Sequence, residues 1–154
     1  MADPWTPERV VTPREAVALI EAQHPSLAPV RVESLGAGWD NTAYRVDDAW
    51  VFRFPKHAAA AALIQAELDV LPAIAERLPL PIPSPRFVGE PTDAYPWPFV
   101  GYAMLPGRTA CQAALDAAGR HALAARAVRQ GLRPLRHQTA LEREIHAIEE
   151  ARLV

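Results

Sequence analysis

A short turn, Gly36–Asn41 (sequence GAGWDN), has the composition of a phosphate-binding loop. Glycine has no side chain, so backbone N–H groups beside it can approach a phosphate closely. Trp39 could close over a nucleotide bound at this turn, with Gly36, Gly38 and Asn41 around the phosphates. Hairpin loops also use glycine for purely steric reasons, so the turn alone leaves both interpretations open.

A second candidate is the apolar segment Val51–Phe54 (VFRF), in which Val51 and Arg53 point to the same face of a strand. This places a small apolar residue where a nucleotide base could rest and a cation where its phosphates would lie. Arginine is always charged and can bind phosphate in bidentate fashion. Taken alone, the segment is better explained as an edge strand with a solvated arginine.

Glu67 lies on the apolar face that we expect for the next helix. A buried carboxylate needs a partner, and Arg53 is the natural one. We therefore predict an ion pair between strand and helix, with an exposed, unpaired glutamate as the alternative.

The apolar segment Pro98–Gly107 (PFVGYAMLPG) runs into a Pro-Gly break. Such a segment could hold a nucleotide base, with Tyr102 beside it and backbone groups of Ala103 and Leu105 bonded to it. The alternative is an ordinary core strand.

These residues need a scaffold, and the sequence predicts one. Thr12, Pro13 and Glu15 form a capping box and helix start, and the helix should run to Gln23 with Val17 and Ile20 inward. Three alternating segments around a tight turn at Asp47-Asp48 predict an antiparallel meander; they are residues 30–35, 42–46 and 49–54.

A second helix should run from Ala58 to Leu71 and kink or restart at Pro72. Its expected inward face comprises Leu63, Ala66, Glu67, Val70, Leu71 and Ile74. Two further strands are expected at 86–89 and 99–104, and helices at 112–130 and 140–152. The fold class is thus α+β, a five-stranded antiparallel sheet with helices, followed by C-terminal helices.

Composition indicates one ordinary globular domain. The chain has 154 residues, a net charge of -2 and one cysteine, which argues against nucleic-acid binding and a disulfide framework. The start lacks a signal-peptide pattern, and the apolar run Ala58–Ile64 is too short for a bilayer. We therefore expect a cytoplasmic protein with no membrane partner.

In this order the segments resemble the N-terminal lobe of aminoglycoside phosphotransferases, in the branch of the 2''-phosphotransferases and macrolide kinases. The matching strings span residues 30–110 well and 12–120 loosely. They are residues 35–41 (LGAGWDN), 51–57 (VFRFPKH), Glu67 with Leu71, 78–83 (LPLPIP), and 89–91 through 95–97 to Gly107.

The resemblance implies a protein-kinase-like fold and transfer of the terminal phosphoryl of ATP or GTP to a hydroxyl of a small molecule. It implies that Gly36, Gly38 and Asn41 belong to the phosphate loop, that Arg53 and Glu67 form the cation–carboxylate pair, and that Tyr102 to Leu105 form the hinge. Asn41 replaces the third glycine of a protein-kinase loop.

The family's catalytic loop, His-x-Asp-x-x-x-x-Asn, has no counterpart here, since none of the five histidines is followed two positions later by aspartate. We therefore expect no catalytic and no metal-binding residue in this chain, and Mg only with a supplied C-terminal lobe. We expect a nucleotide-binding lobe at 1–107 and, at 108–154, a helical linker or the start of a truncated or aberrant lobe.

Two alternatives remain open: a non-catalytic nucleotide-binding or interaction module, and a proline-rich ligand for aromatic grooves. We also expect an exposed apolar face and self-association. A basic stripe of Arg126, Arg129, Arg133 and Arg136 could bind an acidic partner, although a solvated face is the simpler interpretation.

Overall fold

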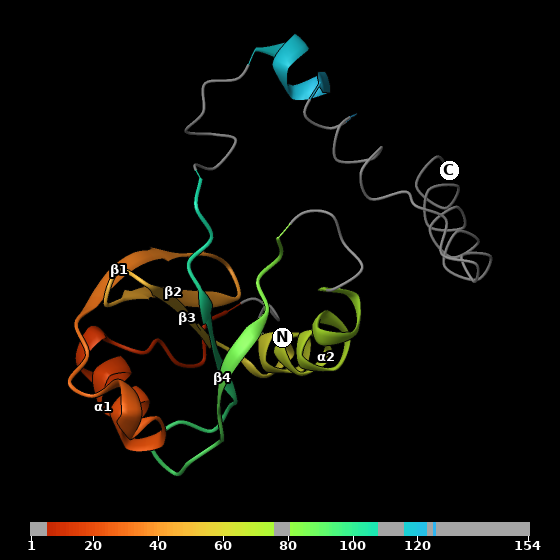
Figure 1. Ribbon diagram of the computed structural model, residues 1–154. Coiled ribbons are helices and arrows are strands. Elements are labelled where there is room, and N and C mark those ends of the chain that lie inside the picture. Colours follow the sequence, from red (N-terminus) through yellow and green to blue (C-terminus); the bar gives the residue numbers. More distant parts are fainter. Residues whose placement is uncertain (1–5, 76–80, 108–115, 123–124, 126–154) are drawn as a thin grey trace, which may run out of the picture. The chain divides into compact units, whose positions relative to one another are not determined.

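A computed structural model describes residues 6–75, 81–107, 116–122 and 125. The chain divides into two compact units, Met1–Gly107 and Arg108–Val154. In the first unit, helices α1 and α2 lie on either side of a twisted sheet (Figure 1). In the second, residues 117–122 and 125 are helical and lie within the predicted helix 112–130. The predicted helix 140–152 and the arginine stripe lie outside the described residues.

Helix α1 (Pro13–Gln23) begins as the sequence predicted. The Glu15 N–H donates to the Thr12 hydroxyl at 3.3 Å, and the Thr12 N–H donates to the Glu15 carboxylate at 2.8 Å. Its buried face centres on Ala16 and Ile20, whereas Val17 is only half-buried. A short 3-10 turn, η1 (Pro25–Leu27), follows.

The meander consists of β1 (Val32–Ala37), β2 (Asn41–Val46) and β3 (Trp50–Pro55). Asp47 and Asp48 both have positive φ, 50° and 57°, and the Ala49 N–H donates to the Val46 carbonyl. That is a type I′ hairpin turn, whose twist matches the flanking strands. The predicted turn and meander are confirmed.

The last strands are β4 (Pro85–Gly89) and β5 (Phe99–Ala103). The sheet order is β1-β2-β3-β5-β4, with every neighbouring pair antiparallel. β5 therefore inserts between β3 and β4, and the five-stranded antiparallel sheet is confirmed.

The two faces of the sheet differ because side chains alternate along each strand. Phe52 and Phe54 pack with Ile20 in the core, so they define the α1 face. Arg53 bonds to Glu67 of α2, so Val51, Arg53 and, across the ladder, Tyr102 define the α2 face. The Tyr95 hydroxyl closes the core by donating to the Pro55 carbonyl at 2.6 Å.

The predicted inward face of helix α2 (Ala58–Ala75) was partly wrong. Ala60, Ala61 and Ile64 are buried, whereas Leu63 and Val70 are 55% and 51% exposed. Ala66 is exposed too, while Glu67, Leu71 and Ile74 are half-buried. The helix is apolar on most sides, so hydrophobic spacing did not identify the packed face. It also continues through Pro72 to Ala75.

This helix is longer than the apolar run that we judged too short to span a membrane. Its 18 residues are apolar and long enough to cross one by length and composition alone. The same helix, however, packs against β3, β4 and β5 and holds Arg53 through Glu67. Its contacts are thus those of a helix that covers the sheet.

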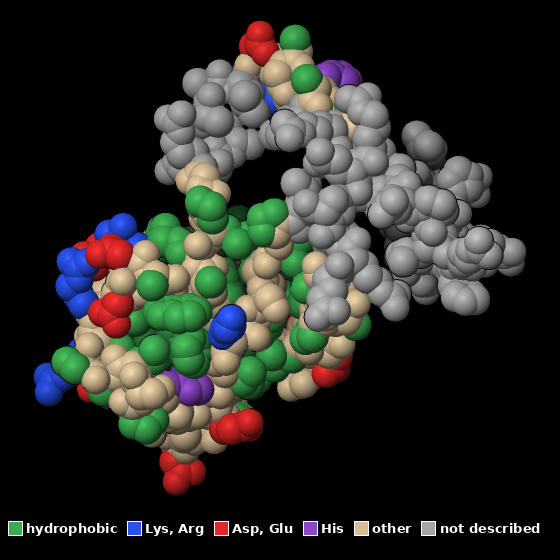
Figure 2. All heavy atoms as spheres, viewed as in Figure 1, with side chains coloured by type: hydrophobic (Ala, Val, Ile, Leu, Met, Phe, Trp, Pro, Cys, Tyr) green, Lys and Arg blue, Asp and Glu red, His purple; other side chains and the backbone are tan. Residues whose placement is uncertain are grey.

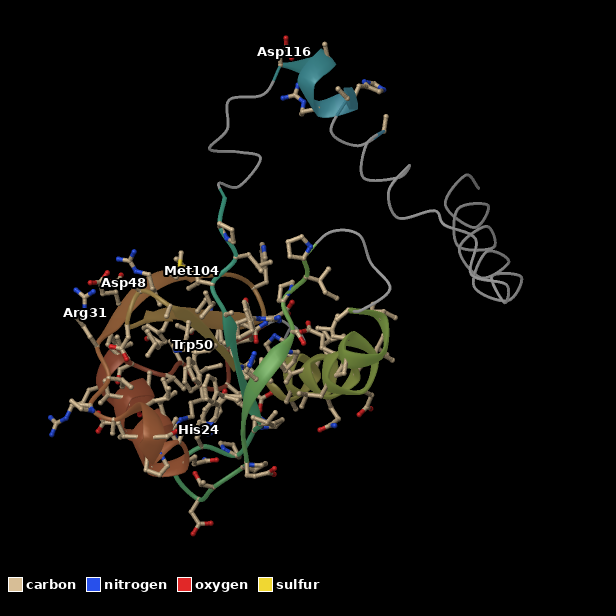
Figure 3. The ribbon with its side chains drawn as sticks, in the orientation of Figure 1. His24, Arg31, Asp48, Trp50, Met104 and Asp116 are labelled. Carbon is tan, nitrogen blue, oxygen red and sulfur yellow. The ribbon has the colours of Figure 1, made fainter. Side chains whose placement is uncertain are left out.

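Charged side chains of opposite sign gather at the outer edge of the meander, where Figure 2 shows red and blue groups intermixed. Arg31 contacts Glu33 at 3.0 Å and Asp48 at 2.5 Å, and Figure 3 shows Arg31 and Asp48 side by side. Arg45 contacts the same two carboxylates. Arg31 and Asp48 are exposed and Glu33 and Arg45 are partly exposed, so screening by water and salt keeps their contribution to stability small.

His24 gives a pH-dependent prediction for stability. Its ring lies among Phe52, Phe87 and Phe99, its Nε2 has no hydrogen-bond partner in the described part of the chain, and burial lowers its pKa from 6.5. In the window below about pH 6.5 the unfolded chain therefore binds a proton that the folded chain does not, so stability falls as pH falls. Urea unfolding between pH 7.5 and 5 should show this loss.

The control for that experiment is His24→Leu, which removes the titrating ring and should flatten the profile in this window. The pKa values of Glu15 and Glu33 are lowered from 4.5 by hydrogen bonds from Thr12 and Arg45 respectively, so these groups act only at lower pH. A profile equally steep in His24→Leu would contradict the assignment.

Candidate functional site

The predicted ion pair between Arg53 and Glu67 is present. The Arg53 guanidinium donates to both Glu67 carboxylate oxygens, at 2.8 and 3.2 Å. Both side chains are partly shielded, with 23% and 34% of their surface exposed. This bidentate geometry fixes the guanidinium plane and ties strand β3 to helix α2. One edge of the guanidinium is thereby occupied by Glu67, and the Tyr102 side chain lies close to the same group.

Val51 and Tyr102 extend the same face. They are directly paired across β3 and β5, and Val51 is only 6% exposed. Burial raises the pKa of Tyr102; the Arg53 charge opposes this rise, and the Glu67 charge adds to it. Tyr102 is thus a neutral, half-buried ring beside the ion pair. The apolar surface of Val51 and Tyr102 therefore lies next to the Arg53 cation that Glu67 holds in place.

The glycine turn, Gly36–Asn41, differs in part from expectation. Gly36 does not break the strand: Gly36 and Ala37 belong to β1, past a register shift after Ser34. The Gly38 N–H donates to the Asn41 carbonyl at 3.0 Å and closes the hairpin. A Cβ placed on Gly36 or Gly38 would meet no atom within 4 Å, so open space lies beside the turn.

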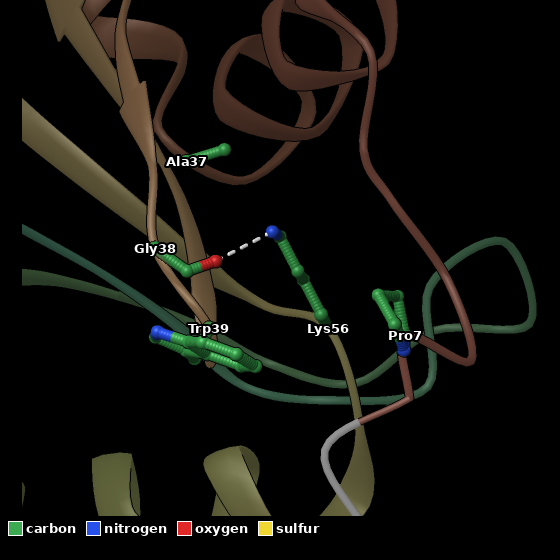
Figure 4. Close-up of a pocket in the computed structure, with 5 residues that line it drawn as sticks. All are labelled: Pro7, Ala37, Gly38, Trp39 and Lys56. Carbon is green, nitrogen blue, oxygen red and sulfur yellow. Dashed lines mark hydrogen bonds between the residues drawn. The ribbon is translucent and has the colours of Figure 1, made fainter.

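Trp39 stands at the tip of this turn and is 80% exposed. With Pro7, Ala37, Gly38 and Lys56 it lines an open hollow of about 370 Å³, shown in Figure 4. Arg53 and Tyr102 are not among the residues that line this hollow. The Asn41 side-chain oxygen is buried and has no hydrogen-bond partner among the described residues.

The segment after β5 has backbone groups to offer. The Met104 N–H donates to the Ala49 carbonyl at 2.8 Å, which anchors the chain against the Asp47-Asp48 hairpin. In the region that the structure describes, no hydrogen bond involves the backbone of Leu105. Met104 and Leu105 are 38% and 36% exposed, and Figure 3 shows Met104 at this end of the sheet. Ala103 is the last residue of β5.

Two neighbours of the site, Lys56 and His57, were given no role in the sequence analysis. Lys56 binds the Gly38 carbonyl through its ammonium group, and His57 approaches the Asp40 carboxylate. Both residues lie in the matching string at 51–57. A lysine next to a histidine at the end of an apolar strand was the signal that could have drawn attention to them. Among the described residues no group of three or more His, Cys, Asp or Glu could hold a metal ion.

The family model of the phosphotransferase enzyme family matches residues 31–153. The chain belongs to this family. The match runs well past residue 120, so the matching strings underestimated how far the resemblance extends. No curated protein matches the chain.

Solved structures of aminoglycoside phosphotransferases share the fold of this family member. The GDP complex of wild-type aminoglycoside 2'-phosphotransferase-IIIa is 27% identical, with a TM-score of 0.68 over 91% of this chain and 51% of its own. The GDP and kanamycin complex of APH(2'')-IIIa is 28% identical, with a TM-score of 0.66 over 88% and 50%. A GDP complex of a variant is 34% identical over 63% of this chain and 32% of that one, with a TM-score of 0.59.

These likenesses confirm the predicted fold class, the kinase-like N-terminal lobe. The phosphotransferase-family chain spans about half the length of the wild-type GDP complex and of the GDP and kanamycin complex.

Proposed function

We propose that residues 1–107 form a nucleotide-binding lobe that presents ATP or GTP for phosphoryl transfer. The observation that carries this proposal is the bidentate Arg53–Glu67 pair on the same face as Val51 and Tyr102. A cation held by a carboxylate can keep its orientation while it binds a phosphate oxygen. Families that transfer phosphoryl groups rely on such positioning and charge stabilisation.

Each site residue has a proposed role. Backbone groups of Gly36, Gly38 and Asn41 approach the phosphates, Trp39 covers them, and Arg53, held by Glu67, binds them. Val51 and Tyr102 flank the base, while the Ala103 and Leu105 backbone bonds its edge. The Leu105 backbone, which forms no hydrogen bond within the described residues, and the open space beside both glycines fit a nucleotide at this place.

The acceptor in this proposal is a hydroxyl of a small molecule, in line with the kanamycin in one relative's complex. Guanine and adenine nucleotides are both candidates, and the GDP complexes of the relatives favour testing GTP first. Mg enters only with a second lobe, because the family's metal-binding aspartate has no counterpart in this sequence. The setting that we propose is the cytoplasm.

A second candidate function is a non-catalytic module that retains the nucleotide site or uses the lobe for interaction. The missing His-x-Asp sequence favours it. Exposed Met104 and Leu105 also fit the expected self-association, for which the sedimentation coefficient at rising protein concentration is the direct measurement.

The proposed site is tested by titrating the 15N-labelled chain with GTP, ATP and adenosine and following amide signals by NMR. We expect weak binding, with Kd on the order of 1 mM. Signals of the glycine turn should shift with the nucleotides and not with adenosine. Arg53→Met should weaken nucleotide binding at least about tenfold, because a charge-assisted phosphate contact is lost.

Arg31→Met is the matched control, since Arg31 is also ion-paired but lies at the outer edge of the sheet. It should bind GTP like the parent chain. Sub-micromolar affinity would contradict the weak binding expected of this chain, and equal losses in both variants would refute the role proposed for Arg53.

A further inference from the structure

Lys56 is the only lysine among the 16 basic residues of the chain, and it is buried. Its ammonium group donates to the Gly38 carbonyl at 2.7 Å, the dashed contact in Figure 4. Among the described residues, no carboxylate forms an ion pair with it. Burying a charge against a neutral carbonyl costs free energy. Packing alone therefore does not explain a lysine here.

The backbone of Lys56 is held firmly. Its N–H donates to the Asp40 carbonyl at 2.8 Å, and its own carbonyl accepts the N–H groups of Glu8 and Arg9 at 2.8 and 3.0 Å. The residue that binds Gly38 is thus anchored both to the glycine turn and to the segment that leads into α1. It can act as a fixed support for the turn.

The contact between Lys56 and the Gly38 carbonyl also fixes the orientation of the peptide between Gly38 and Trp39. In a planar trans peptide the C=O of one residue and the N–H of the next point in opposite directions. The only cis peptide in the described residues is Ala28–Pro29. When Lys56 binds the Gly38 carbonyl, the Trp39 N–H must therefore point away from the Lys56 ammonium group.

His57 makes a second connection. It is 1% exposed, its Nδ1 accepts the Ala60 N–H in the first turn of α2, and its Nε2 lies 3.3 Å from the Asp40 carboxylate. An Nδ1 that accepts a hydrogen bond leaves the ring proton on Nε2, facing Asp40. His57 thereby connects the glycine turn with the helix that carries Glu67 by contact alone, since neither its Nε2 nor the facing Asp40 oxygen has a hydrogen-bond partner among the described residues.

We propose that Lys56 and His57 are positioning residues of the phosphate site: Lys56 orients the Gly38–Trp39 peptide so that its N–H faces the phosphates, and His57 ties Asp40 to α2. This inference rests on the proposed nucleotide site. In this proposal Lys56 and His57 act on the phosphates indirectly, through the glycine turn. Loss of the support should weaken binding of phosphates and leave binding of the nucleoside unchanged.

The test compares the parent chain with Lys56→Met, which keeps the side-chain length and removes the charge and donors. ATP and adenosine affinities and amide exchange are measured by NMR on the whole chain. Lys56→Met should weaken ATP binding about tenfold, equivalent to about 1.4 kcal/mol, and change adenosine binding less than about twofold. Exchange at the Trp39 amide should accelerate, while that at Phe52 in the core stays as in the parent.

Arg14→Met, which removes an exposed cation from α1, is the matched control and should match the parent. Asp40→Ala, at a partly exposed position, probes the His57 connection and should weaken ATP binding about threefold. Equal ATP affinity in Lys56→Met and the parent, or equal losses for ATP and adenosine, overturns the role of Lys56. Parent-like ATP binding by Asp40→Ala overturns that of His57.

Failure of the parent chain to bind ATP would refute the proposed function instead. Whether Lys56 supports the glycine turn is then decided by the exchange rate of the Trp39 amide alone. Faster exchange in Lys56→Met confirms that Lys56 orients this peptide, and parent-like exchange overturns it.

Discussion

Gly101→Ala is expected to cost about 3 kcal/mol of stability or more, because the added methyl would overlap the core. A Cβ at Gly101 would lie 2.5 Å from the Phe52 ring, far inside van der Waals contact. Phe52 is fully buried and stacks on Phe87, so its ring cannot retreat without displacing a second aromatic. Such a loss is a large part of the 5–15 kcal/mol that holds a typical domain. The measurement is urea unfolding followed by far-UV circular dichroism.

Gly38→Ala is the matched control for this experiment. The same atom is added at an exposed turn, where a Cβ meets nothing within 4 Å. It should change the free energy of unfolding by less than about 0.5 kcal/mol. Equal losses in the two variants would mean that Gly101 does not face Phe52 as the structure shows.

Gly101 also illustrates what the sequence could and could not reveal. Its position inside an apolar strand was visible, but the reason for a glycine there was not, because Phe52 approaches it from 49 residues away along the chain. Sequence patterns predicted the structure correctly where residues within one turn determine the local conformation. The Thr12–Glu15 capping box and the Asp47-Asp48 hairpin depend on neighbouring residues, and both were predicted correctly.

Predictions that depend on packing were weaker. Helix α2 offered apolar residues on most sides, so only its contacts with the sheet could select Ala60, Ala61 and Ile64 over Leu63 and Val70. The Arg53–Glu67 pair was predictable for the opposite reason. A buried carboxylate restricts its partners to a cation, and Arg53 lay on the right face of the right strand.

Lys56 and His57 were missed for a further physical reason. Their side chains contact backbone carbonyl groups and the N-terminus of a helix. A sequence does not reveal which of these backbone groups will lie beside a given side chain. A buried lysine bonded to a carbonyl becomes recognisable only when the hairpin and the N-terminal segment are brought together. The nucleotide-binding roles of the site residues remain predictions that binding measurements must decide.

The 154-residue chain alone should transfer no measurable phosphoryl group from ATP or GTP to kanamycin, gentamicin or a macrolide. Arg53 and the glycine turn can hold phosphates, but orienting the acceptor hydroxyl and binding the metal need carboxylates that the sequence does not offer in the family's arrangement. The measurement is nucleoside diphosphate release coupled to mass spectrometry of the drug. Turnover that Arg53→Ala abolishes and Arg31→Ala leaves intact would contradict this expectation.

A chimera provides the positive counterpart, with residues 1–107 replacing the matching part of 2'-phosphotransferase-IIIa. It should phosphorylate kanamycin, since the relative then supplies the catalytic groups and this lobe supplies the nucleotide site. Arg53→Ala in the chimera should lower kcat/KM about a hundredfold or more, the scale expected when a preorganised charge contact to the reacting phosphates is lost. An active chimera indifferent to Arg53→Ala would show that the lobe acts only as a scaffold, since phosphate binding would then not require its strand–helix ion pair.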